Sequence, residues 1–165
     1  MQYSSKAIAN KFLELSRNEN LDITQMKLQK LVYISHGFCL AILNKPLISD
    51  DIQAWQYGPI IPELYNEFKP FGKSPIKSLA TNMYVDDDLE IIKTPVYINK
   101  NDNEINDLLE TIWEKYKRYN GIQLSNMTHQ DNTPWHQTYK NGIPNQNIKN
   151  DVIKRYYISL IEDKS

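Results

Sequence analysis

The sequence predicts a mainly α-helical, compact single-domain fold in which shorter elements surround one central buried helix at about residues 24–43. Its 165 residues match the size of one ordinary domain, so we expect residues 1–165 to form a single domain. Apolar residues recur at helical spacing over most of the chain. Strand-forming residues gather in few places, which predicts a small β-hairpin or sheet insertion at about residues 52–57 and 84–98.

The charge balance argues against some broad classes of partner. Lys and Arg number 19 and Asp and Glu number 20, so the formal net charge is -1. The chain therefore lacks the basic surplus that binds nucleic acid or acidic membranes through overall charge, although a local basic face stays open. With 41% apolar and 11% aromatic residues the chain can bury a core, which argues against global disorder.

The single cysteine and the N-terminus bear on the compartment. Cys39 lies in an apolar run, and we interpret it as a small buried side chain rather than a nucleophile. One cysteine can form neither an intramolecular disulfide nor a cysteine zinc cluster. The N-terminus lacks the apolar stretch of a signal peptide, and no apolar run reaches the ~20 residues that span a bilayer. We therefore expect a cytoplasmic protein without a membrane partner.

The first helix is expected at residues 4–17, where four apolar side chains share one face. Ser4 or Ser5 can act as its N-cap, and the polar residues 18–20 end it.

The second helix begins after Asp22 or Thr24 and is apolar on nearly all sides, which is typical of a helix at the centre of a fold. Gly37 lies in its middle at a cost of about 1 kcal/mol relative to alanine, so we expect a neighbour to pack closely there. The polar exceptions on this helix are Lys27, Gln29, Lys30 and His36.

Alternation over residues 52–57 predicts a short strand or extended stretch that Gly58-Pro59 ends, and residues 59–68 then predict a helix. Residues 82–100 are rich in β-branched side chains, and Pro95 restricts them to an edge strand or a hairpin arm. The acidic run Asp86-Asp87-Asp88 lacks the spacing of a calcium loop and is interpreted as a solvated turn.

The C-terminal third predicts four more helical segments. Asn120-Gly121 is expected to close the first of them with a left-handed C-cap. The segments are residues 104–119, 124–130, 134–139 and 146–161.

The inventory for catalysis is poor. His36, His129 and His136 are the best candidates for acid–base chemistry, but no spacing of a metal site and no nucleophile or phosphate-binding motif accompanies them. We therefore expect no enzymatic activity, no cofactor and no metal.

Two aromatic segments are candidates for binding a partner. In residues 54–62, Gly58-Pro59 forms a rigid bend that can present Trp55 and Tyr57, and in residues 127–135 a capped helix begins with Pro134 and Trp135. The tryptophans could instead be core anchors that clamp loops to the central helix. The candidate partner-binding residues are Trp55, Tyr57, Gly58, Pro59 and Trp135.

The sequence resembles the Panacea domain family, also described as SocA-like or phage-associated proteins. The resemblance rests on Met26–Gly37 (MKLQKLVYISHG), on Gln53–Pro62 (QAWQYGPIIP) and on the later Thr128-His129 and Thr133-Pro134-Trp135. Among its polar residues, Gln29 and Lys30 are expected to hydrogen-bond the aromatic loop to the central helix. We interpret Gln29, Lys30, His36 and His129 as structural in the first place.

The resemblance implies an antitoxin-like protein of bacterial or prophage origin that neutralises a cognate toxin, encoded adjacently, by direct protein–protein contact. Two alternatives stay open: an adaptor that delivers a toxin to an ATP-dependent protease, and a prophage protein that acts on host processes without a toxin. The sequence predicts neither the toxin's identity, nor the contact surface, nor the oligomeric state.

Overall fold

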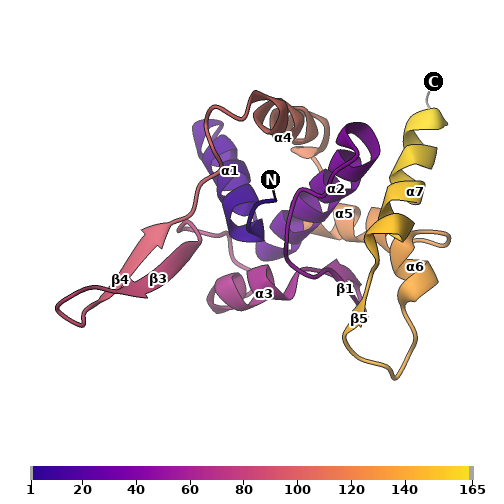
Figure 1. The fold of residues 1–165 in the computed structure, drawn as a ribbon. Helices are drawn as coiled ribbons and strands as arrows, with labels where there is room; N and C mark the ends of the chain where they lie inside the picture. Colours follow the sequence, from indigo (N-terminus) through magenta and orange to yellow (C-terminus); the bar gives the residue numbers. More distant parts are fainter. Residues whose placement is uncertain (1, 164–165) are drawn as a thin grey trace.

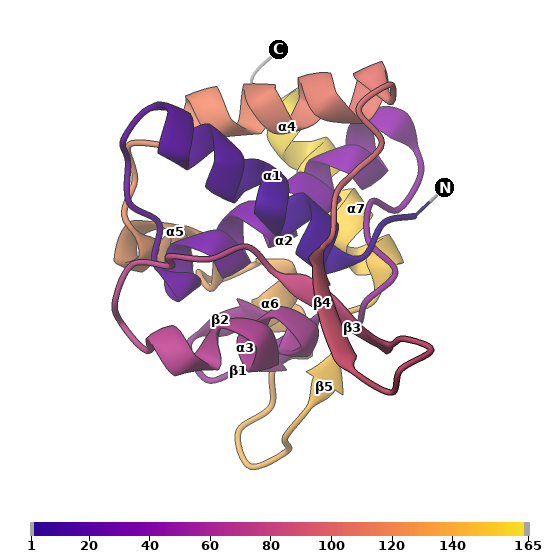
Figure 2. The ribbon, with the colours of Figure 1, turned by 90° about the vertical axis from the view of Figure 1, so that its left-hand side faces the viewer.

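The computed structural model describes residues 2–163, and helix α2 (Gln25–Leu43) lies at its centre (Figure 1). Every residue of α2 from Lys27 to Leu40 is buried, which confirms the predicted central helix and the mainly α-helical fold. The helices that pack against α2 are α1 (Ser5–Asn18), α3 (Pro62–Phe68), α4 (Asn103–Tyr116), α5 (Gly121–Thr128) and α7 (Asn150–Glu162). Figure 2 shows α1 and α4 side by side on one flank of α2.

Side-chain caps begin α1 and α2. The Ser4 hydroxyl accepts a hydrogen bond from the backbone nitrogen of Lys6 at the start of α1, and Thr24 Oγ1 accepts one from Lys27 at the start of α2. Gly37 faces the ring of Tyr157 on α7, and a Cβ atom at this position would lie 2.3 Å from that ring. The expectation of a close neighbour at Gly37 is therefore confirmed.

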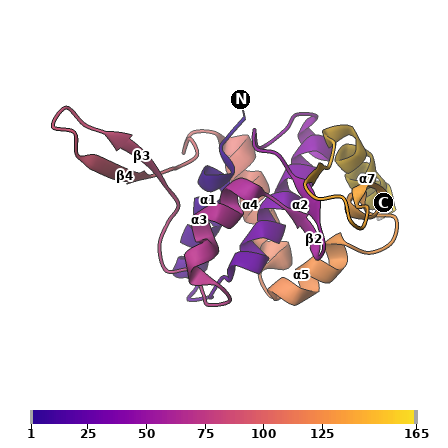
Figure 3. The ribbon, with the colours of Figure 1, turned by 90° about the horizontal axis from the view of Figure 1, so that it is seen from below.

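The predicted strand segments belong to two separate sheets. Strands β1 (Gln53–Trp55), β2 (Gly58–Ile60) and β5 (Gln146–Asn147) form an antiparallel sheet in the order β2-β1-β5. Among the described residues, strands β3 (Thr81–Val85) and β4 (Ile91–Pro95) pair only with each other, and their hairpin projects from the helical body (Figures 1 and 3).

Two expected boundaries near Pro59 were wrong. Gly58-Pro59 does not end the extended stretch but belongs to β2, where Pro59 pairs with Ala54. Helix α3 therefore begins at Pro62 and ends at Phe68, followed by a short 3-10 turn at Lys69–Phe71. The proline at position 62 fits the first turn of α3, because its missing N–H has no partner there in any helix.

The predicted C-cap at Gly121 was also wrong. Helix α4 ends at Tyr116, and Gly121 is the first residue of α5. Asn120 is the N-cap of α5 and forms a reciprocal capping box with Gln123. A Cβ at Gly121 would lie 3.0 Å from the backbone nitrogen of Lys27, so glycine permits close approach of α5 to α2.

The last two predicted segments are shorter than expected. Helix α6 spans Pro134–Thr138, with Thr133 as its N-cap. Residues 146 and 147 form strand β5 instead of helix, because they pair with β1, and α7 begins only at Asn150. Cys39 is fully buried in the core, as its apolar surroundings predicted. Among residues 2–163, none of the helices combines the length and the apolar composition that a membrane-spanning segment needs.

Candidate partner-binding site

The hairpin of β1 and β2 is held to the central helix by two buried polar side chains. The Gln29 amide donates to the carbonyl oxygen of Ile61 at 3.0 Å and accepts from the Ile61 nitrogen at 2.8 Å. Lys30 Nζ donates to the carbonyl oxygen of Pro59 at 2.7 Å. Because both side chains are about 1% exposed, these bonds fix the backbone of β2 away from competing water.

The turn between β1 and β2 depends on Gly58. Its φ of +118° is a conformation that L-residues with a side chain rarely adopt, and a Cβ there would lie 3.1 Å from Lys30 Nζ. Burial lowers the pKa of Lys30 from 10.5 to about 7. Gly58 and Pro59 are themselves buried and shape the turn, and their contact with a partner stays a prediction.

Residues of α5 and α6 hold the other side of the hairpin. Ser125 Oγ donates to the carbonyl oxygen of Tyr57 at 2.8 Å, and Trp135 Nε1 donates to that of Trp55 at 2.5 Å. The His129 ring meets Trp135 edge to face, with 5.3 Å between ring centroids, and its Nδ1 bonds the Ser125 carbonyl. His129 and Trp135 thus belong to the support of the Trp55–Tyr57 backbone.

The side chains of the hairpin differ in exposure. Tyr57 is 68% exposed at the turn, although its backbone is fixed. Trp55 is half-buried against Tyr65, with ring centroids 5.0 Å apart, and its Nε1 donates to Gln53. Of the five predicted binding residues, Tyr57, Trp55 and Trp135 therefore leave surface open to a partner, and their contact with one stays a prediction.

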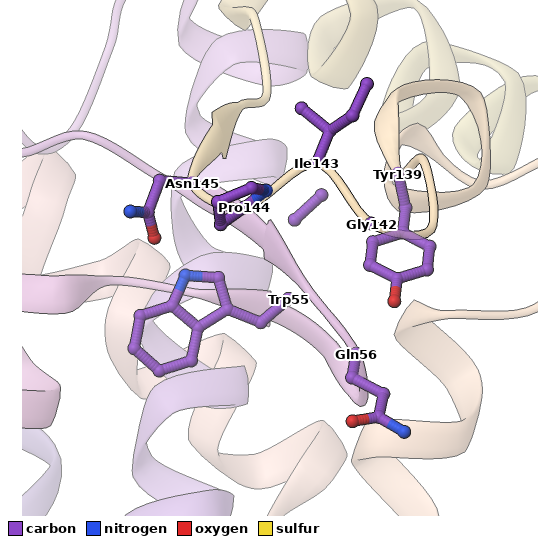
Figure 4. Close-up of a pocket in the computed structure, with 8 residues that line it drawn as sticks. Trp55, Gln56, Tyr139, Gly142, Ile143, Pro144 and Asn145 are labelled. Carbon is purple, nitrogen blue, oxygen red and sulfur yellow. The ribbon is translucent and has the colours of Figure 1, made fainter.

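A shallow groove of about 460 Å³ lies beside Trp55 (Figure 4). Figure 4 shows Trp55 beside Pro144 and Asn145 of the loop before β5, with Tyr139 near Gly142 in the same loop. Tyr139 stacks on Trp135, with 4.8 Å between ring centroids, so both tryptophans border one aromatic region. The lining residues are Ala54, Trp55, Gln56, Tyr139, Gly142, Ile143, Pro144 and Asn145.

Sequence reasoning missed Tyr139 and the loop 142–145 as neighbours of Trp55. The pairing of β5 with β1 brings them together across about ninety residues of chain, and two-residue strands leave no periodic pattern. Asn145 and Gly142 at positive φ are the local signal of a turn in this loop.

His36 takes part in a different set of contacts. Its Nδ1 accepts hydrogen bonds from the backbone nitrogens of Leu47 and Ile48, at 3.2 and 3.3 Å. Its Nε2 therefore carries the hydrogen and donates to Asn150 Oδ1 at 2.8 Å, at the start of α7. Burial lowers the pKa of His36. The three histidines do not form one cluster of contacts, since His136 is exposed with Nε2 3.6 Å from Asp131.

Over residues 2–163, no three His, Cys, Asp or Glu side chains gather as a metal site would require.

Comparison with known proteins gives the family. The family model described as "Antitoxin SocA-like, Panacea domain" matches residues 28–136, from within α2 through β1 and β2 to α6. The chain is also similar to Antitoxin SocA of Caulobacter vibrioides (strain NA1000 / CB15N), at 29% identity over 131 residues, which are 79% of this chain and 68% of that protein. No solved structure matches the chain. Because the family model covers well over half of its residues, the chain belongs to the Panacea domain family of SocA-like antitoxins.

Proposed function

We propose that this protein is an antitoxin that neutralises a cognate protein toxin in the cytoplasm by direct contact, without catalysis. The observation that carries the proposal is the similarity to Antitoxin SocA over 79% of the chain. The resemblance of the central-helix and hairpin motifs to the Panacea family supports it, since the family model matches the whole hairpin motif and all but the first two residues of the central-helix motif.

The geometry of the candidate site supports a binding role. Tyrosine and tryptophan side chains on a fixed backbone offer large contact area with little loss of conformational freedom. Here Tyr57 and Trp55 are carried by a hairpin that α2, α5 and α6 hold through hydrogen bonds. A typical interface buries roughly 800 Å² per partner, a small part of the 9492 Å² surface of this chain.

Co-expression with the product of the neighbouring reading frame tests the proposal. We expect that product to stop growth when expressed alone, and growth to recover with the antitoxin present. The two proteins should also purify together at a fixed ratio. Unchanged toxicity together with the absence of co-purification would reject the proposal.

The same experiment separates the alternatives. If protection disappears in a host that lacks one ATP-dependent protease, and toxin level then rises, the chain acts as a proteolytic adaptor. If the neighbouring product is harmless, the prophage alternative takes precedence. A His129→Ala or His136→Ala variant that protects fully would argue against a catalytic role for that histidine.

The candidate site is tested by Tyr57→Ser. This variant removes the exposed ring and leaves the carbonyl that Ser125 binds, so the fold should be unaffected. We expect affinity for the toxin to fall by about tenfold or more. Tyr119→Ser is the matched control, because Tyr119 is also exposed but lies between α4 and α5. Equal affinity of wild type and Tyr57→Ser would exclude Tyr57 as a contact.

A further inference from the structure

The hairpin of β3 and β4, called the arm (residues 81–95), leaves the helical body from a fixed base (Figures 1 and 3). The base is held by Asn10 of α1, which is fully buried. Its amide donates to the carbonyl oxygens of Ala80 and Val96, at 2.9 and 2.8 Å, and accepts from the Ala80 nitrogen at 2.7 Å. A buried three-bond clamp sets the direction in which the arm projects.

The first residue of the arm is held as well. Thr81 donates its backbone nitrogen to Glu67 Oε1 at 3.0 Å, and its carbonyl accepts from Lys6 Nζ at 3.1 Å. Lys6 also pairs with Glu67 at 3.4 Å. The base is therefore anchored to both α1 and α3, and only the distal part of the arm is free of the body.

One face of the distal arm is apolar and open to solvent. The antiparallel register places Val85 opposite Ile91 and Met83 opposite Lys93, so these side chains share a face. Met83, Val85 and Ile91 are 66%, 60% and 69% exposed. A two-stranded hairpin is marginal in water and gains nothing from apolar side chains that touch no core. Folding alone does not account for this face.

The turn at the tip gives an independent observation. Asp86 and Glu90 are paired through the Asp86 nitrogen and the Glu90 carbonyl at 3.0 Å, which leaves a three-residue loop that ends in Leu89. Leu89 has a φ of +61°, a position that glycine or asparagine fills with less strain. Its side chain is 84% exposed. Neither the turn geometry nor core packing favours leucine at this position. A contact between its side chain and another molecule would account for it.

The charge of the tip indicates the chemistry of that molecule. The arm carries Asp86, Asp87, Asp88 and Glu90 against the single cation Lys93, a net charge of -3. Within residues 2–163, no ion pair involves these four carboxylates. Two tips of identical chains brought together would repel, which disfavours a second copy as the occupant. A surface with basic side chains would be attracted.

We propose that the arm docks into a cleft of the protein toxin, with an apolar floor that contacts Leu89, Val85 and Ile91 and a basic rim that faces Asp87 and Asp88. This inference rests on the proposed antitoxin function and names a contact surface apart from the Tyr57 hairpin. A projecting arm with a rigid base fits a concave site, and little of the arm needs to be ordered on binding. Charge complementarity at the rim steers association and fixes orientation.

Leu89→Asn is the sharpest test, because folding and binding should respond in opposite directions. Asparagine suits the left-handed turn position, so the melting temperature should stay equal or rise. Affinity for the product of the neighbouring reading frame should fall by about tenfold or more, because an apolar anchor is lost. Ile122→Asn is the matched control: Ile122 is 67% exposed on α5, and its replacement should leave the affinity unchanged.

The charge of the tip is tested by reversing Asp87 and Asp88 to lysine together. Binding of wild type should weaken as salt rises, and the double variant should bind more weakly and lose most of that salt dependence. Asp107→Lys, an exposed change on α4, serves as the control.

A shortened arm keeps the test independent of single side chains. Asn82 lies opposite Thr94, two positions from the Ala80–Val96 pair in which Val96 donates to Ala80. The alternation of antiparallel pairs makes Asn82–Thr94 a hydrogen-bonded pair, which an Asn-Gly turn can close in place of residues 83–93. This variant keeps the Asn10 clamp, so it should fold and yet fail to bind or to protect.

The outcomes separate the two proposals. If wild type binds the toxin and the arm variants bind equally well, the arm has no docking role and the antitoxin function stands. If wild type does not bind the toxin, both proposals fail. If wild type is a dimer that Leu89→Asn converts to a monomer, the occupant is a second copy, and the toxin cleft is rejected.

Discussion

Replacing Lys30 by methionine should flatten the dependence of folding stability on pH. Lys30 is buried in the folded protein, where its pKa is lowered to about 7, whereas in the unfolded chain it is 10.5. Between these values the unfolded chain binds one more proton than the folded chain. The free energy of unfolding therefore rises with pH through this interval. Well below pH 7, the contribution of Lys30 to this free energy is constant and at its lowest.

The magnitude follows from the two pKa values. Each pH unit in the interval contributes about 1.4 kcal/mol, and the partial titration near pH 7 leaves a rise of about 2 kcal/mol between pH 7 and 9. Methionine has a similar length and does not titrate, so this rise should vanish. It also leaves the buried Pro59 carbonyl without its donor, at a cost of about 1–3 kcal/mol that does not depend on pH.

Urea denaturation followed by circular dichroism, at pH 7, 8 and 9, measures the effect in both proteins. Burial raises the pKa of the Cys39 thiol to about 11, which lowers stability above pH 9. That contribution is present in wild type and in Lys30→Met and cancels in their difference. The difference in unfolding free energy should grow by about 2 kcal/mol from pH 7 to 9. Two stability curves that run parallel over this range would refute the reasoning.

Three further predictions concern the central helix. Gly37→Ala should lower the unfolding free energy by about 1–3 kcal/mol despite its better helix propensity, because the new Cβ would meet the Tyr157 ring at 2.3 Å; a stabilised variant in urea denaturation would contradict this. Gln29→Leu should cost about 2–4 kcal/mol in the same assay, because it leaves both backbone groups of Ile61 buried and unpaired, and a cost below 1 kcal/mol would show that they find other partners. Since burial lowers the pKa of His36, acid should reduce stability below about pH 6.5, and His36→Gln should show a smaller drop in melting temperature from pH 7 to 5.

Features set by local chemistry could be predicted from the sequence. The apolar circumference of residues 24–43 predicted the central helix. Ser4 and Thr24, each one of two N-cap candidates that the sequence offered, are the N-caps of α1 and α2. Pro95 was correctly confined to a hairpin arm. It lies opposite Thr81 at a pair that makes no ladder hydrogen bond, where its missing N–H costs nothing.

Features set by distant pairing could not be predicted. Strand β5 is two residues long and exists only because β1 lies beside it. Asn120-Gly121 fits the end of one helix as well as the start of the next, and only the reciprocal bond from Gln123 decides between them. The burial of Asn10 at the base of the arm could not be predicted, because a polar residue on an amphipathic helix is expected to face solvent.

The four polar exceptions on α2 explain how this helix organises the candidate site. All four are buried, and each hydrogen-bonds the backbone of another segment. Lys30 binds the backbone of Pro59 in β2, and Gln29 binds that of Ile61 directly after β2. His36 binds the backbone nitrogens of residues 47 and 48, and Lys27 donates to the carbonyl oxygen of Lys117 after α4. The central-helix motif is thus accounted for by scaffolding contacts.

A motif used in this way does not itself need to touch a toxin. Surfaces that these contacts leave open include the Tyr57 turn, the groove beside Trp55 and the arm, and these three lie outside α2. Substitutions there would alter exposed side chains without disturbing the buried hydrogen bonds that hold the fold. On the proposed antitoxin function, we therefore expect partner specificity to depend on the turn, the groove and the arm, and not on the central helix.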